Sequence, residues 1–211
     1  ALGISADEAA QLVGNFTAIA GLSAEASINL SKQVTLLAKA NNVAPQAVLQ
    51  DIASSSGDIA AFTDATAENI AEAAIQAKKL GVSLSDVASS AKKMLDFESA
   101  MEAALNAQVM TGRQINIQKL QELALSGDLK GYQQEQVNLL GSASQWNKMN
   151  ILEKEALANA VGLEVDQAAK LVNKQKEATT LAGRLASQKG FEELVGEEAL
   201  GSLQRIINGL K

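Results

Sequence analysis

Histidine and cysteine are both absent from the 211-residue sequence. Without cysteine the chain can form no disulfide and offers no thiolate; a reducing compartment is permitted by this absence but not required. Without histidine it lacks the most common general base and the most common metal ligand. The sequence also contains no metal-ligand spacing, no calcium or phosphate-binding loop and no serine-nucleophile motif. We therefore predict a non-enzymatic protein with no catalytic residues, no cofactor and no metal, with a Ser–Lys or carboxylate mechanism left open.

Proline and aromatic residues are scarce, with one proline (Pro45) and 3% aromatics. No run shows the period-two pattern of β-branched and aromatic residues that strands need. The 47% hydrophobic content is enough for one sizeable core or two small ones, and it comes mainly from Ala, Leu, Val and Ile. Alanine is the best helix former, and small side chains let helices approach closely. The composition therefore predicts an all-α fold.

Positive charge is also in short supply, since the net charge is −6. An acidic chain is poorly suited to a nucleic-acid surface, and the basic pairs at 78–79 and 92–93 fit solvated helix faces. No apolar run approaches the roughly 20 residues of a membrane span, and no signal peptide is visible. We expect neither a nucleic-acid partner nor a membrane span. Because the chain begins with Ala1 and ends without a polar tail, we expect a piece of a longer protein, with removal of an initiator Met as the alternative.

A short unit of glycine, an apolar residue and a capping residue recurs where helices are expected to join. Glycine or asparagine accepts the left-handed conformation that ends one helix, the apolar residue packs against the next, and Ser or Pro begins it. Irregular spacing argues against a true repeat array, so ordinary helix punctuation and a diverged duplication both stay open. The units are Gly3–Ser5, Gly21–Ser23, Asn42–Pro45, Gly81–Ser83 and Gly162–Glu164.

One stretch, about residues 83–111, contains no glycine or proline before Gly112. Ser83 fits an N-cap and Asp86 suits the first turn, so the stretch predicts a single helix of about 28 residues, roughly 40 Å long. An apolar seam at heptad-like spacing runs along it, formed by Val87, Met94, Phe97, Met101 and Ala104. We predict an array of short-to-medium capped helices packed around this long helix. The predicted segments are an N-terminal helical segment (1–82), a central helical module (83–178) and a C-terminal helical tail (179–211).

Further helix starts are predicted by polar capping residues placed before apolar-periodic runs. Before the long helix these are Ser5, Ser23 and Thr66, with Pro45 at the first position of another helix; after it they are Asn116, Asp128, Ser144 and Asn150.

The only tryptophan, Trp146, and the only tyrosine, Tyr132, both follow the long helix. Aromatic side chains dominate the energetics of cores and of protein interfaces. One interpretation makes them core anchors beneath the 141–150 loop. The other makes Tyr132, Trp146 and the neighbouring Met149 contact residues for a protein partner.

Five segments between residues 97 and 171 form a recognisable set: Phe97–Ala100, Thr111–Asn116, Glu122–Leu129, Trp146–Leu152 and Ala156–Leu163. Through these segments, residues 97–171 resemble a module of large tailed-phage structural proteins of the tape-measure kind. Tape-measure proteins set tail length as extended helical rods in the tail tube and are expelled at infection. The present sequence departs from that picture because its helices are repeatedly capped and broken, so the resemblance implies a folded region and not the measuring rod.

The resemblance implies a virion component, assembled in the host cytoplasm, that contacts other virion or tail proteins; contact with further copies of the chain stays open. Two alternatives stay open: a helical scaffold or adaptor domain of non-viral origin, and the non-catalytic helical arm of a tail-associated hydrolase. Association with tail or baseplate chains without turnover would favour the first hypothesis, and a soluble host partner the second. A cleft of converging carboxylates would favour the third.

Overall fold

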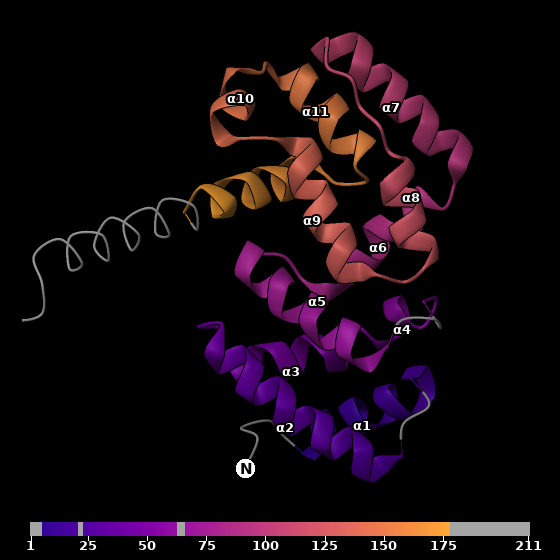
Figure 1. Cartoon of the computed structure of the whole chain (residues 1–211), viewed down its shortest axis with the longest axis vertical. Helices are drawn as coiled ribbons and strands as arrows, with labels where there is room; N and C mark the ends of the chain where they lie inside the picture. Colours follow the sequence, from indigo (N-terminus) through magenta and orange to yellow (C-terminus); the bar gives the residue numbers. More distant parts are fainter. Residues whose placement is uncertain (1–5, 21–22, 63–65, 178–211) are drawn as a thin grey trace, which may run out of the picture. The chain divides into compact units, whose positions relative to one another are not determined.

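The computed structural model describes residues 6–20, 23–62 and 66–177 (Figure 1). Every regular element in these ranges is an α-helix, and they contain no strand, so the predicted all-α fold is confirmed. The predicted cap Ser5, the units at Gly3 and Gly21 and the predicted tail 179–211 lie wholly or partly outside the described residues.

The helices are connected by short turns. In chain order they are α1 (Ala6–Ala20), α2 (Ala24–Ala40), α3 (Pro45–Ser54), α4 (Ser56–Ile59), α5 (Ala67–Leu80), α6 (Leu84–Met94), α7 (Phe97–Thr111), α8 (Gln118–Leu125), α9 (Leu129–Leu140), α10 (Ala143–Lys148) and α11 (Ile151–Ala160), followed by a helix that covers residues 165–177.

Most of the predicted helix starts are confirmed. The side chains of Ser23, Thr66, Asp128 and Asn150 accept hydrogen bonds from the backbone N–H three residues ahead, and Pro45 is the first residue of α3. Ser83 and Asp86 form a complete capping box at α6. Two starts differ: Ser142, not Ser144, caps α10, and α8 begins at Gln118 with Ile117 in the cap position. Asn116 instead accepts a hydrogen bond from the Gln118 N–H at 3.0 Å.

The predicted long helix over residues 83–111 is wrong, because α6 ends at Met94 and α7 begins at Phe97. Asp96 caps α7: its carboxylate accepts hydrogen bonds from the Ser99 hydroxyl at 2.7 Å and the Ser99 N–H at 3.3 Å. These two bonds, the hydroxyl first, lower the pKa of Asp96 below its ordinary value. A capping aspartate can begin a new helix where the sequence has neither glycine nor proline, which are the only breaks that the prediction counts.

The core forms around α5 and α6 and not around one long helix. Helix α5 packs against α1, α2, α3, α6 and α9, and α6 also packs against α3, α4, α7, α8 and α9. Residues on both sides of position 82 therefore belong to one compact unit, Ala1–Lys174; a second unit begins at Gln175. Over the described ranges, no helix combines the length and apolar character needed to cross a membrane.

Candidate functional site

The three residues predicted to contact a partner pack within the chain itself. Tyr132 on α9 is 0% exposed and Trp146 on α10 is 4% exposed, so both are core residues. Met149 follows α10, is partly buried and packs against the same core. Tyr132 and Trp146 therefore lie where the first interpretation from the sequence, that of core anchors, places them.

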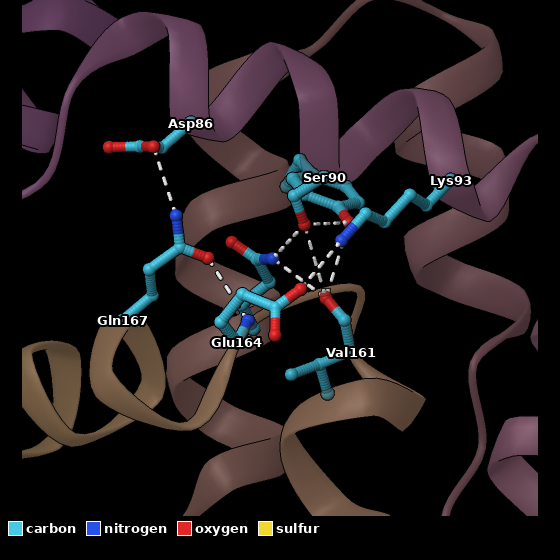
Figure 2. A network of polar contacts seen from close by, with 8 residues as sticks. Asp86, Ser90, Lys93, Val161, Glu164 and Gln167 are labelled. Atoms are coloured by element: carbon cyan, nitrogen blue, oxygen red, sulfur yellow. Dashed lines mark hydrogen bonds and ion pairs between the residues drawn. The ribbon is translucent and has the colours of Figure 1, made fainter. Parts of the chain in front are cut away.

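A buried polar network joins three helices around Ser90 and Val161, which Figure 2 labels, and Tyr132 belongs to this network. The amide Nε2 of Gln136 on α9 donates to Ser90 Oγ on α6 at 2.7 Å and to the Val161 carbonyl, just beyond α11, at 2.8 Å. The Tyr132 hydroxyl lies 2.9 Å from Ser90 Oγ. Burial raises the pKa of the Tyr132 phenol above its ordinary value of 10.0. The network satisfies polar groups that would otherwise be costly to bury, and it fixes the end of α11.

A second set of contacts, also drawn in Figure 2, holds α6 to the start of the helix at 165–177. Gln167 Nε2 donates to Asp86 Oδ1 at 2.9 Å, and Gln167 Oε1 accepts from the Glu164 N–H at 3.0 Å. Lys93 and Glu164 form an exposed ion pair at 3.3 Å. Together with the buried network, these bonds place α6 and the end of α11 in a fixed arrangement, and α7 packs on both helices.

Helix α7 buries three of its four alanines. Ala100, Ala104 and Ala107 are at most 3% exposed, and α7 lies beside α11, which buries Ala156 and Ala160 (Figure 1). Alanine faces allow two helix backbones to approach closely. Residues from the start of α7 line a hollow together with Asn159 and Gly162 from the end of α11, so the two helices run antiparallel.

The large apolar side chains of α7 lie on its uncovered side. Phe97 is 51% exposed, Met101 47%, Leu105 55% and Val109 83%, and these four residues, spaced four apart, form what we call the α7 outer face. A surface helix ordinarily turns its large apolar residues toward the core. On α7 these four side chains instead remain largely uncovered by the described part of this chain.

A shallow, open hollow of about 570 Å³ lies along the same side of α7. It is lined by Glu98, Met101, Glu102, Leu105, Asn106 and Val109. Contiguous apolar surface with a polar rim is typical of protein-interaction sites. The α7 outer face is therefore the candidate functional site.

The heptad-like pattern does not indicate this site, because it places Phe97 and Met101 in one seam with Val87, Met94 and Ala104. Val87, Met94 and Ala104 are at most 2% exposed, whereas Phe97 and Met101 are about half exposed. The signal that could have found it is the composition of residues 97–111: alanines on one side and larger apolar residues on the other.

Comparison of the chain with protein-family models, with curated proteins and with solved structures finds no match. Within the described ranges, no group of three or more acidic side chains is placed to hold a metal ion. The case for the α7 outer face rests on the geometry of this chain alone.

Proposed function

We propose that this chain is a folded helical region of a tape-measure-like phage tail protein, and that it works in the virion through protein–protein contact at the α7 outer face. The resemblance of residues 97–171 to tape-measure-like proteins supports the tail assignment. The observation that carries the contact role is the inverted orientation of α7, with Ala100, Ala104 and Ala107 buried and the four large residues of the α7 outer face exposed.

The size of this face sets the kind of contact that it supports. Complete burial of such a side chain is worth about 1.5–3 kcal/mol, so finishing the burial of four that are 47–83% exposed contributes roughly 3.5–7 kcal/mol. Association costs about 4–15 kcal/mol in lost freedom of motion, so one face gives a weak contact by itself. Repeated copies in a symmetric tail would raise the effective concentration and make the same weak contact persist.

A pair of matched variants tests the proposal. Leu105→Lys places a charge in the centre of the α7 outer face, whereas Leu36→Lys places the same charge at a 67% exposed leucine of α2. Each tagged variant is expressed together with the other tail proteins of its source, and sedimentation separates assembled tails from free chains. Leu105→Lys should reduce the fraction in the tail at least about tenfold, while Leu36→Lys should leave it unchanged.

Three outcomes would contradict the proposal. If the unchanged chain does not sediment with tails, the tail assignment is wrong. If it is recovered instead in a stable complex with a host protein, the non-viral adaptor takes its place. If both lysine variants sediment like the unchanged chain, the α7 outer face is not the contact surface. Circular dichroism of each variant shows that a loss does not come from unfolding.

A further inference from the structure

The charges beside the α7 outer face indicate what kind of partner it accepts. Glu98 and Glu102 are the only charged residues of α7, and both are exposed. Each follows an apolar residue of the face by one position, Phe97 or Met101, and both line the hollow along the helix. Within the described part of the chain, neither carboxylate lies within ion-pair distance of a Lys or Arg.

These charges are distributed unevenly along the helix. Both carboxylates lie in the first half of α7, and the second half, residues 105–111, has no charged side chain. The face is thus apolar along its length and acidic at one end. A complementary surface needs an apolar stripe with positive charge at the end that meets Glu98 and Glu102.

The α7 helix of a second copy of the chain does not supply that surface. Helix α7 has no Lys or Arg, so parallel pairing of two α7 helices would bring carboxylates together, and antiparallel pairing would set them against uncharged residues. The first cation after α7 is Arg113, whose guanidinium already donates to the carbonyls of Leu139 at 2.8 Å and Leu140 at 3.3 Å. Self-pairing through this face would leave the carboxylates without partners.

We propose that the α7 outer face binds an amphipathic helix of another protein whose apolar stripe is flanked by two lysine or arginine residues, one turn apart, that pair with Glu98 and Glu102. This inference rests on the proposed function, because it names the partner of the same face. Opposite charges that flank an apolar seam set the choice of partner and the orientation of paired helices. The apolar stripe supplies most of the binding energy, and the ion pairs fix the direction in which the partner runs.

Two synthetic peptides test the charge requirement. They are helix-stabilised, carry the same stripe of leucines and a fluorophore, and differ only in the flanking residues, lysine in one and glutamate in the other. Fluorescence anisotropy measures the binding of each to the full chain. At low salt the lysine peptide should bind about tenfold more tightly than the glutamate peptide, and added salt should narrow the difference.

Charge-reversal variants make the test specific to this face. The double variant Glu98→Lys with Glu102→Lys should prefer the glutamate peptide, and Glu102→Lys alone, in the interior of α7, should shift the preference partway. Glu122→Lys reverses an exposed carboxylate on α8 and should leave the preference unchanged. Leu105→Lys should weaken the binding of both peptides.

Equal binding of the two peptides, or a preference that the double variant does not reverse, would overturn the inference. So would a concentration-dependent dimer of the chain that Leu105→Lys abolishes, because the occupant would then be a second copy. The two proposals fail separately. If Leu105→Lys abolishes tail association but the chain binds both peptides equally, only the proposal of a basic partner helix is wrong. If the chain prefers the lysine peptide but does not associate with tails, only the tail assignment is wrong.

Discussion

The side-chain amide of Gln136, inside α9, donates a hydrogen bond of 2.8 Å to the main-chain carbonyl of Val161, where α11 ends. The same amide bonds to Ser90 on α6 at 2.7 Å. One buried side chain of α9 thus joins α6 to the end of α11, and its two partners, Ser90 and Val161, lie 71 positions apart in the sequence. Since α7 packs its alanine face on α11, this bond also helps to position the α7 outer face.

Gln136→Ala should destabilise the fold by about 2–4 kcal/mol, because it removes two buried hydrogen bonds and leaves the Val161 carbonyl poorly satisfied. Gln134→Ala, at an exposed position of the same helix, should change stability by less than about 0.5 kcal/mol. Urea unfolding followed by Trp146 fluorescence measures both. Equal losses of stability for the two variants would show that the buried hydrogen bonds of Gln136 stabilise the fold no more than an exposed glutamine does.

Gly162→Ala should be more harmful than Gly112→Ala, although both glycines have positive φ angles of +77° and +65°. A Cβ at Gly162 would lie 2.8 Å from Ser90 Oγ and 2.9 Å from the Ser90 carbonyl oxygen, whereas a Cβ at Gly112 would meet nothing within 4 Å. We expect Gly112→Ala to destabilise the fold by about 1–2 kcal/mol through backbone strain. We expect Gly162→Ala to destabilise it by about 3 kcal/mol or more, because the close contacts with Ser90 add to the same strain. Urea midpoints compare them directly, and similar midpoints would rule out close packing at Gly162.

Asp51 links three helices from a nearly buried position, with 6% of its surface exposed. Its carboxylate accepts from the Leu84 N–H at the start of α6 at 2.9 Å and lies 3.2 Å from Lys78 Nζ on α5. Asp51→Ala should cost about 2–3 kcal/mol, whereas Asp51→Asn keeps an acceptor for Leu84 and should cost about 1 kcal/mol. Chemical unfolding of both variants checks this order. Equal losses of stability in the two variants would mean that the hydrogen bond from the Leu84 N–H contributes little to the stability of the fold.

Alkaline pH should weaken the fold through Tyr132. Because its pKa is raised in the folded chain, the folded state holds the phenol proton to higher pH than the unfolded state does. The stability that this burial provides is complete below a pH of about 10, the unfolded pKa, and falls as the pH rises above it. Tyr132 is the only tyrosine, so tyrosinate absorbance reports it alone. If the Tyr132 phenol ionises at its ordinary pKa while the chain stays folded, the burial of Tyr132 is contradicted.

Local sequence chemistry accounts for much of the fold. Ser83 with Asp86, and Asn150 with Glu153, satisfy N–H groups at the start of their own helices, so their role can be predicted from a few neighbouring residues. The break at Asp96 was predictable in principle by the same chemistry, from an aspartate three residues before Ser99. It was missed because only glycine and proline were treated as helix breaks.

Long-range packing accounts for what the sequence could not predict. Gln133 and Gln136 are each 1% exposed, yet nothing in their neighbourhood in the sequence indicates that their partners are Ala73, Ser90 and Val161. The same holds for α7. Ala100, Ala104 and Ala107 face inward because α11 lies beside them. The sequence separates alanines from larger apolar residues on α7, but it does not state which of these sides a neighbouring helix will cover.

The most direct test of the central claim, that another protein covers the α7 outer face, is the oxidation rate of Met101 by hydrogen peroxide. Met101 is 47% exposed in the chain, while Met94 is 2% exposed and serves as the buried reference. Mass spectrometry can follow both residues in the isolated chain and in assembled tails. We predict that Met101 oxidises much faster than Met94 in the isolated chain and nearly as slowly as Met94 in the assembly; equally fast oxidation of Met101 in both would contradict the account.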